Sequence, residues 1–198
     1  MQLYGTGERQ GRMSQFDYRK SELDPTYTLQ ILDPFIGKIK RGNLIPRVLD
    51  LGAGEGEAGV YMGSKAVNIV KADISRNGLK GECDATQAVA WKLPFPNKTF
   101  DGIHSKDMLT HIPTEFRPRL FYELNRVTKP TGRITICSVN QEDGDHFQYP
   151  VIKDDLICYA GLYGFSIENS FEWNPNHMYK DWYKSIIPRF VLELKKIV

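Results

Sequence analysis

The stretch Val48 to Gly56 reads V-L-D-L-G-A-G-E-G, an apolar run that contains Asp50 and ends in glycines at alternate positions. A Val- and Leu-rich run that stops at closely spaced glycines predicts a buried strand followed by a sharp turn. Glycine suits a turn that a ligand crosses, because a Cβ would collide with the ligand while nearby N–H groups supply donors. The stretch therefore predicts a nucleotide-like cofactor at the end of a strand.

The glycines alone are compatible with two cofactors. Gly54 to Gly59 satisfies the G-x-G-x-x-G pattern of dinucleotide binders, and Asp73 follows at roughly the 20-residue distance expected of a ribose-binding acid. In a dinucleotide fold, however, the first of these glycines directly follows the strand, and the frame that starts at Gly52 puts Glu57 in place of the third glycine. An NAD(P)-dependent oxidoreductase is the alternative interpretation, and a non-catalytic binding protein of the same fold is another.

The carboxylate of Asp50, at the end of the predicted strand, favours a different cofactor. Its negative charge would attract an ammonium and a sulfonium group but repel a pyrophosphate. The order D-x-G-x-G-x-G that starts at Asp50 resembles the first motif of the class I S-adenosylmethionine-dependent methyltransferases.

Three later stretches extend this resemblance over about residues 48 to 139. Val67 to Ser75 is similar to a second strand that ends in an acid, Leu93 to Ser105 to the loop that leads into the fourth strand, and Glu123 to Ile136 to the fifth helix, its Pro-Gly turn and the fifth strand. Several matched motifs in the right order are more specific than any one of them. The resemblance implies an α/β Rossmann-like three-layer sandwich. Its mostly parallel seven-stranded sheet would have the order 3-2-1-4-5-7-6 and an antiparallel terminal hairpin.

The resemblance also implies a binding site for S-adenosyl-L-methionine, which leaves as S-adenosyl-L-homocysteine. Asp73 would accept hydrogen bonds from both ribose hydroxyls, and Ser105 and Lys106, which the resemblance places after the fourth strand together with Asp107, would contact the methionine part. The expected cofactor-binding residues are Asp50, Gly52, Ala53, Gly54, Glu55, Gly56, Asp73, Ile74, Val89, Ala90, Ser105 and Lys106.

Two local departures from the family pattern affect the alignment. Counting back from Leu93 puts Val89 and Ala90 near the adenine, whereas counting forward from the second strand puts Asp84 and Ala85 there. We favour Val89 and Ala90, because the apolar run 88–91 makes the better strand end. In the Pro-Gly turn, Thr131 replaces a glycine, and we expect Gly132 to take the positive φ.

The expected chemistry is in-line displacement of the methyl group from a sulfonium, an excellent leaving group. The protein would align the acceptor, exclude water and, for a hydroxyl or ammonium acceptor, remove a proton. His111, His146 and His177 are weak candidates for the base, and spacing alone does not choose among them. The sequence identifies no catalytic residue. We expect a small-molecule acceptor, because no basic aromatic platform indicates RNA.

Composition and length favour one domain without membrane or metal sites. We divide residues 1–198 into an N-terminal arm and helical cap (1–42), a cofactor-binding core (43–140) and a substrate-side lid with the terminal hairpin (141–198). No run of roughly 18 apolar residues and no signal peptide is visible, so we expect no membrane span and a cytoplasmic protein. The three cysteines lack metal-type spacing, and a net charge of +2 does not indicate a nucleic-acid partner.

Caps and periodicity predict the remaining elements. Asp24-Pro25 and Asp33-Pro34 each resemble an N-cap with a first-turn proline, which gives two short helices or one kinked helix that ends near Gly42. In the helix 118–127, an apolar stripe leaves Arg119 and Glu123 to pair outside it. Further helices are expected over 57–62 and 153–163, and strands over 166–173 and 189–195.

Overall fold

A computed structural model describes residues 23–41, 44–75, 79, 84–140, 149–174 and 189–197. The helices are α2 (Pro25–Tyr27), α3 (Asp33–Lys40), α4 (Glu57–Ser64), α5 (Arg117–Val127) and α6 (Lys153–Leu162). The strands are β1 (Arg47–Leu51), β2 (Asn68–Asp73), β3 (Ala85–Gln87), β4 (Phe100–Lys106), β5 (Thr128–Val139), β6 (Phe165–Trp173) and β7 (Arg189–Lys196).

The strands form one seven-stranded sheet in the order β3-β2-β1-β4-β5-β7-β6. Pairing is parallel from β3 to β5, whereas β7 runs antiparallel to both β5 and β6. The order reverses direction beside β1, where β2 lies on one side and β4 on the other, and ligands of open α/β sheets bind at such a switch point. The predicted fold and strand order are confirmed.

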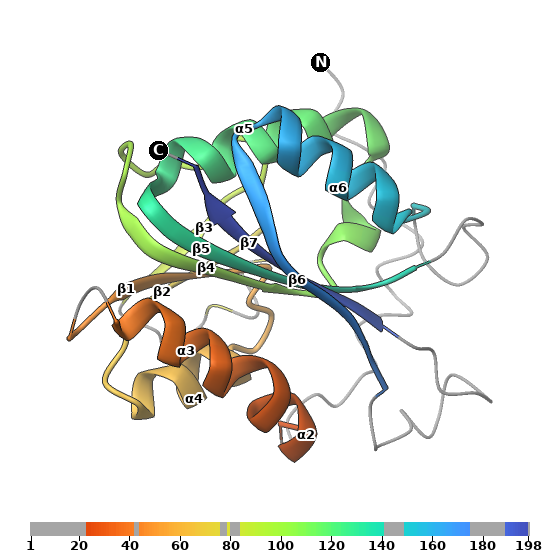
Figure 1. The fold of residues 1–198 in the computed structure, drawn as a ribbon. Helices are drawn as coiled ribbons and strands as arrows, with labels where there is room; N and C mark the ends of the chain where they lie inside the picture. The colour runs from red at the N-terminus through yellow and green to blue at the C-terminus, as the bar shows by residue number, and fades with distance from the viewer. Residues whose placement is uncertain are drawn as a thin grey trace.

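Helices cover both faces of this sheet. Helices α5 and α6 lie over one face, and α2, α3 and α4 lie over the other (Figure 1). The apolar stripe predicted for α5 is buried, with Leu120, Phe121, Leu124 and Val127 each at most 2% exposed. Full burial of such a side chain contributes roughly 1.5–3 kcal/mol, so this stripe fixes α5 on the sheet.

The N-terminal helical region is one continuous segment. Asp24 caps α2 by accepting from Thr26 N (2.8 Å), and a π-helical stretch, Thr28–Leu32, joins α2 directly to α3. Asp33 is therefore no N-cap; its carboxylate instead accepts a hydrogen bond from the Tyr61 hydroxyl (2.7 Å). Of the two predicted alternatives the single helix is observed, and it ends at Lys40.

The Pro-Gly turn at Thr131 and Gly132 differs from the prediction. Thr131 has the positive φ (61°), and Gly132 does not. Gly132 is needed for space instead, because a Cβ there would lie 2.6 Å from Thr128 Cγ2 and 3.0 Å from the Lys129 carbonyl oxygen. The expectation of a positive φ at Gly132 is wrong, since close packing and not backbone handedness requires the glycine.

We expect Gly132→Ala to destabilise the protein by about 1–3 kcal/mol, the usual cost of overpacking. Chemical denaturation measures the change. Gly161→Ala in α6 is the matched control, because its Cβ would meet nothing within 4 Å. That control should be neutral or up to ~1 kcal/mol more stable. Equal stability of Gly132→Ala and wild type would show that the turn relaxes without cost.

Glu123 does not pair with Arg119 as predicted. It is buried, accepts from Leu93 N (2.8 Å) and forms an ion pair with Arg126 (2.7 Å). The Arg126 hydrogen bonds lower the pKa of Glu123, so this contribution to stability is present at neutral pH and is lost as acid protonates the carboxylate. Arg126 also donates to the carbonyl oxygens of Leu93 and Phe95, which fixes the loop before β4 against α5.

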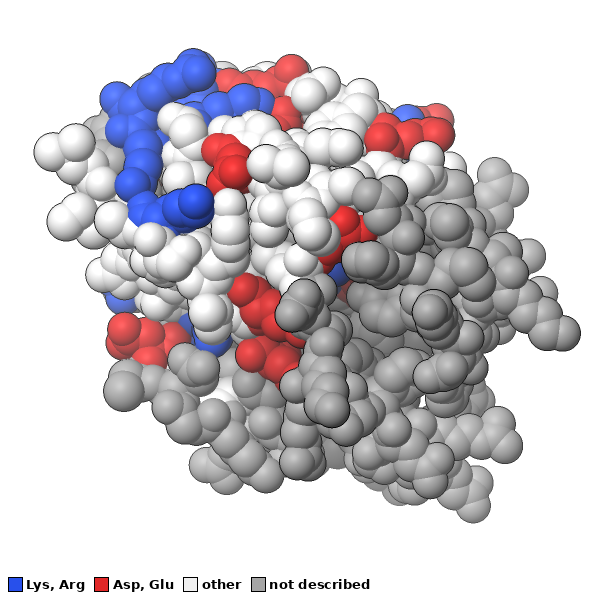
Figure 2. Space-filling model, turned by 90° about the horizontal axis from the view of Figure 1, so that it is seen from below, with Lys and Arg blue, Asp and Glu red and all other residues white. Residues whose placement is uncertain are grey.

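Seen from the side of α3 and α4, the surface of the molecule has Lys and Arg side chains gathered at one edge (Figure 2). Lys40, at the end of α3, donates to the carbonyl oxygen of Lys65 just after α4 (2.5 Å). Cations near helix C-termini complement the helix dipoles, so the Lys40 ammonium has a structural role between the ends of α3 and α4. No helix in the described ranges is both long and apolar enough to span a bilayer.

Candidate functional site

The glycine turn links β1 to α4 at the switch point of the sheet. Gly52, Gly54 and Gly56 have φ values of 74°, 53° and 82°, all in the left-handed region. The N–H groups of Gly52 and Ala53 both donate to the carbonyl oxygen of Ala72 in β2 (2.8 and 3.3 Å). The turn therefore bends over the end of β2.

The three glycines differ in what a side chain would meet. A Cβ on Gly52 would lie 2.7 Å from Met108 Cβ, and one on Gly56 would collide with the end of the Lys71 side chain. A Cβ on Gly54 would meet nothing within 4 Å. A side chain is thus obstructed at Gly52 and Gly56, whereas the backbone of Gly54 is exposed and has open space beside it.

Asp73 lies at the end of β2 and contacts this turn directly. One carboxylate oxygen accepts from Gly54 N (2.9 Å) and the other from Ser75 N (2.7 Å). The next residue, Ile74, is 63% exposed and presents an apolar side chain beside the acid. An ionised carboxylate has about four acceptor positions, so capacity remains for two ligand hydroxyls.

The two residue pairs considered for the adenine contact lie at opposite ends of β3. Asp84 precedes β3, and its carbonyl oxygen accepts from Lys71 N (2.8 Å), so Asp84 lies at the amino end of the strand. Val89 and Ala90 follow the carboxyl end, where Ala88 N donates to the Asp73 carbonyl oxygen (2.9 Å). The favoured pair is thus the one on the same edge as Asp73.

The apolar run 88–91 does not form the end of a strand, and this part of the prediction is wrong. Ala85–Gln87 forms β3 by pairing with Lys71 to Asp73, and the run that follows turns back so that Val89 bridges Lys92. Ala90 and Leu93 are buried in the main core. The apolar residues therefore serve tertiary packing and not strand pairing.

Ser105 and Lys106 were expected after the fourth strand, but β4 continues through Lys106. Successive side chains of a strand point to opposite faces. Ser105 is buried on the α5 side among apolar residues that include Leu120 and Leu124. Lys106 lies on the other side, with its ammonium 4.8 Å from the Tyr27 ring centre and 5.8 Å from a Trp173 ring centre.

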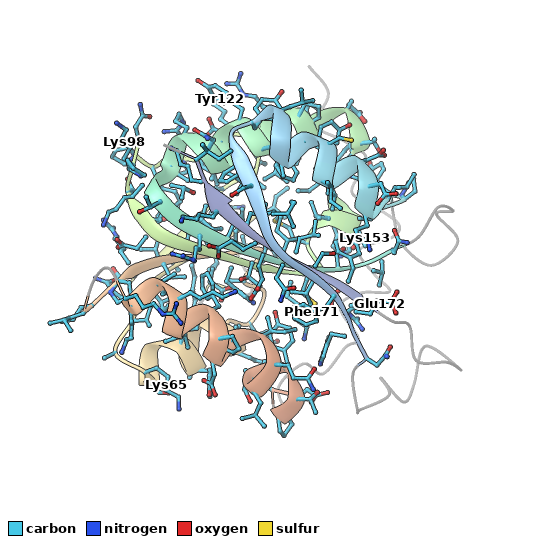
Figure 3. All side chains as sticks on the ribbon, in the orientation of Figure 1. Lys65, Lys98, Tyr122, Lys153, Phe171 and Glu172 are labelled. Atoms are coloured by element: carbon cyan, nitrogen blue, oxygen red, sulfur yellow. The ribbon has the colours of Figure 1, made fainter. Side chains whose placement is uncertain are left out.

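The directions of the strands bring three further side chains to this edge of the sheet, namely those of Asp107, Trp173 and Arg189. Trp173 pairs with Arg189 where β6 ends and β7 begins, and Arg189 also pairs with Val139 at the end of β5. Arg189 Nε donates to both oxygens of Asp107 (2.8 and 3.1 Å). The labelled Phe171 and Glu172 mark this end of β6 in Figure 3. No sequence pattern indicates the Arg189–Asp107 pair.

Asp50 is buried, not exposed at the glycine turn. It is 2% exposed, and its Oδ1 lies 2.7 Å from Nδ1 of His104 in β4. Its Oδ2 has no hydrogen-bond partner among the residues that the structure describes. The structure thus places the acid of the first motif beneath the turn, in contact with a core histidine.

Of the three candidate bases, the structure describes only His111. His111 is exposed and ends a 3₁₀ turn, Leu109–His111, that follows β4. Arg117 supports this turn by donating to the carbonyl oxygens of Leu109 (3.4 Å) and Pro150 (2.5 Å). His146 and His177 lie outside the described residues.

Of the other predicted residues, Ala53 is half-buried and Glu55 is exposed. No cluster of three metal-ligating side chains occurs within the described ranges. Burial raises the pKa of the Cys137 thiol far above its usual range, so this cysteine remains protonated in the core.

Part of the chain is similar to known proteins. A family model described as "Methyltransferase domain" matches residues 49–136. The chain is 34% identical over 101 residues to phosphoethanolamine N-methyltransferase 3 of Arabidopsis thaliana, which covers 46% of this chain and 20% of that protein. It is 36% identical over 100 residues to demethylmenaquinone methyltransferase of Clavibacter sepedonicus, which covers 46% of this chain and 40% of that protein. The chain thus spans less than half the length of these relatives.

A solved structure shares the fold over nearly the whole chain. An S-adenosylmethionine-dependent methyltransferase from Methanosarcina mazei superposes with a TM-score of 0.72 at 17% identity, covering 90% of this chain and all of that one. The family match includes the glycine turn, Asp73 and the strands from β1 to β5. Residues 49–136 are thus similar to the methyltransferase-domain family, and the chain shares its fold with a solved S-adenosylmethionine-dependent methyltransferase.

Proposed function

We propose that this chain transfers the methyl group of S-adenosylmethionine to a small-molecule acceptor. The observation that carries the proposal is the junction of Gly54 and Asp73. There a backbone position open to a ligand lies in hydrogen-bond contact with a partly exposed carboxylate at the switch point of the sheet. The ribose of the cofactor would bind Asp73, and the adenine would lie beside Ile74 and Val89.

The cofactor supplies the reactive methyl group and the leaving group, so the chain has to position the acceptor and exclude water. Lys106, Asp107, His111 and Trp173 surround the adjoining edge of the sheet and would line the acceptor side. His111 is the exposed candidate for removing a proton from a hydroxyl or ammonium acceptor. Lys106 would face the methionine part of the cofactor.

The names of the relatives support a small acceptor. One is named for phosphoethanolamine and another for demethylmenaquinone, both small molecules. The two names give different compounds, so the proposal names the class of acceptor and not the compound.

We expect S-adenosylhomocysteine to raise the melting temperature of the protein, because a ligand that binds only the folded state stabilises it by mass action. NAD and NADP should leave the melting temperature unchanged. Differential scanning fluorimetry at millimolar ligand makes the comparison. A shift from NAD without one from S-adenosylhomocysteine would replace this proposal with the oxidoreductase alternative.

A further inference from the structure

A buried chain of hydrogen bonds connects the first-motif acid to the helix that covers the sheet. Asp50 and His104 are direct neighbours in β1 and β4, and their side chains meet at 2.7 Å. The other ring nitrogen, Nε2 of His104, lies 2.7 Å from the hydroxyl oxygen of Tyr27 in α2. Asp50, His104 and Tyr27 are all at most 2% exposed.

The hydrogen-bonding roles along this chain follow from its two ends. An ionised Asp50 only accepts, so Nδ1 of His104 carries the proton and donates it. Burial raises the pKa of Tyr27 well above its usual value, so its hydroxyl stays protonated and donates to Nε2. With the proton on Nδ1, His104 donates to Asp50 and accepts from Tyr27, so the hydrogen bonds run in one direction from Tyr27 to Asp50.

The hydrogen-bonded series ends at Tyr27, whose ring lies at the candidate site. Its centre is 4.8 Å from the Lys106 ammonium and 5.0 Å from the Trp173 ring. Lys106 forms no ion pair with a carboxylate in the described parts of the chain, and its ammonium lies over these two aromatic faces. A cation over an aromatic face is oriented by that face, so the position of the Tyr27 ring sets the position of the ammonium.

We propose that Tyr27 is a positioning residue for cofactor binding: anchored through His104 to Asp50, its ring holds the Lys106 ammonium toward the methionine part of S-adenosylmethionine. In this arrangement Asp50 acts on the cofactor through His104 and Tyr27 and not by direct contact. The inference rests on the proposed function, because it assigns a role to residues around the same cofactor.

The test compares two ligands that differ in the group that Lys106 would contact. S-adenosylhomocysteine carries the amino-acid carboxylate, whereas 5′-methylthioadenosine has the same adenosine without it. Tyr27→Phe keeps the ring but removes the bond to His104. We expect it to weaken S-adenosylhomocysteine about five- to tenfold and 5′-methylthioadenosine less than twofold, as measured by titration calorimetry. A purely structural role of the hydroxyl would not discriminate between the ligands.

Two further variants make the test specific. His104→Asn retains an amide donor for Asp50 but loses the partner of Tyr27, so it should reproduce the selective loss, and the double variant should lose no more than the larger single one. Tyr61→Phe is the matched control. It removes a hydroxyl bond of the same length (2.7 Å) that ties the same helical segment to α4 without touching His104. It should weaken both ligands less than twofold.

The outcomes separate the inference from the proposed function. Equal losses of both ligands in Tyr27→Phe, no loss at all, or the same selective loss in Tyr61→Phe would overturn the positioning role while wild-type binding of S-adenosylhomocysteine upholds the cofactor assignment. Absence of binding by the wild-type protein would overturn the proposed function and the inference with it.

Discussion

Gly54→Val is expected to abolish binding of S-adenosylhomocysteine, with a loss of affinity of at least a hundredfold. Gly54 has a φ of 53°, and its Cβ would project into open space at the junction with Asp73. The two methyl groups of valine would occupy the space through which we expect the ligand to cross the backbone. The free energy of binding lost would exceed about 2.7 kcal/mol.

The left-handed backbone complicates this substitution, because a β-branched residue there costs roughly 1–2 kcal/mol. Gly54→Asn separates the two causes, since asparagine tolerates this conformation yet still adds a side chain. Both variants should retain the circular dichroism spectrum of the wild type and fail to bind in calorimetry. Gly37→Val controls for the chemical change itself, because a Cβ at Gly37 in α3 also meets nothing within 4 Å. Wild-type affinity in a folded Gly54→Asn variant would limit the turn to a structural role.

Asp73→Ala should weaken S-adenosylhomocysteine roughly ten- to a hundredfold. The carboxylate would accept hydrogen bonds from both ribose hydroxyls, and the loss of charge-assisted bonds typically costs ~1.5–3 kcal/mol. The fold should survive, because Asp73 ends a strand and is only partly buried. Calorimetric titration gives the affinity, and a thermal melt checks folding.

A 2′-deoxyribose analogue is needed because Asp73 also holds the Gly54 N–H of the turn. The analogue should bind the wild type poorly but lose little more when Asp73 is removed, since one interaction would have been deleted twice. If the two losses add, Asp73 organises the turn without touching the 2′-hydroxyl, and the proposed cofactor orientation fails.

The sequence by itself determined the glycine turn and most of the elements, and its resemblance to a known family implied the strand order. Apolar runs, caps and the spacing of glycines are local signals, and the resemblance to a known family arranged them into the 3-2-1-4-5-7-6 sheet that is observed. Asp73 likewise lies where the motif predicts, because the last residue of a parallel strand is carried to the carboxyl edge by the strand itself.

Local signals failed where burial and packing chose among equivalent residues. Thr131 and not Gly132 takes the positive φ, because Gly132 is needed for close contact. Glu123 could pair with either Arg119 or Arg126 by helix spacing. Only the position of Leu93, whose N–H donates to the same carboxylate, decided for the buried arrangement with Arg126.

Only the tertiary structure decided which side chains meet at the candidate site. Tyr27 and His104 are separated by 77 residues, Asp50 and His104 by 54, and Asp107 and Arg189 by 82. Each of these pairs depends on which elements are neighbours in space and on the side to which each side chain points. No periodicity within one segment encodes such a pairing, because the energy of a buried polar contact depends on both partners leaving water together. The sequence therefore specified the elements and the cofactor class, while the three-dimensional packing specified how the acid, the histidine and the tyrosine act as one unit.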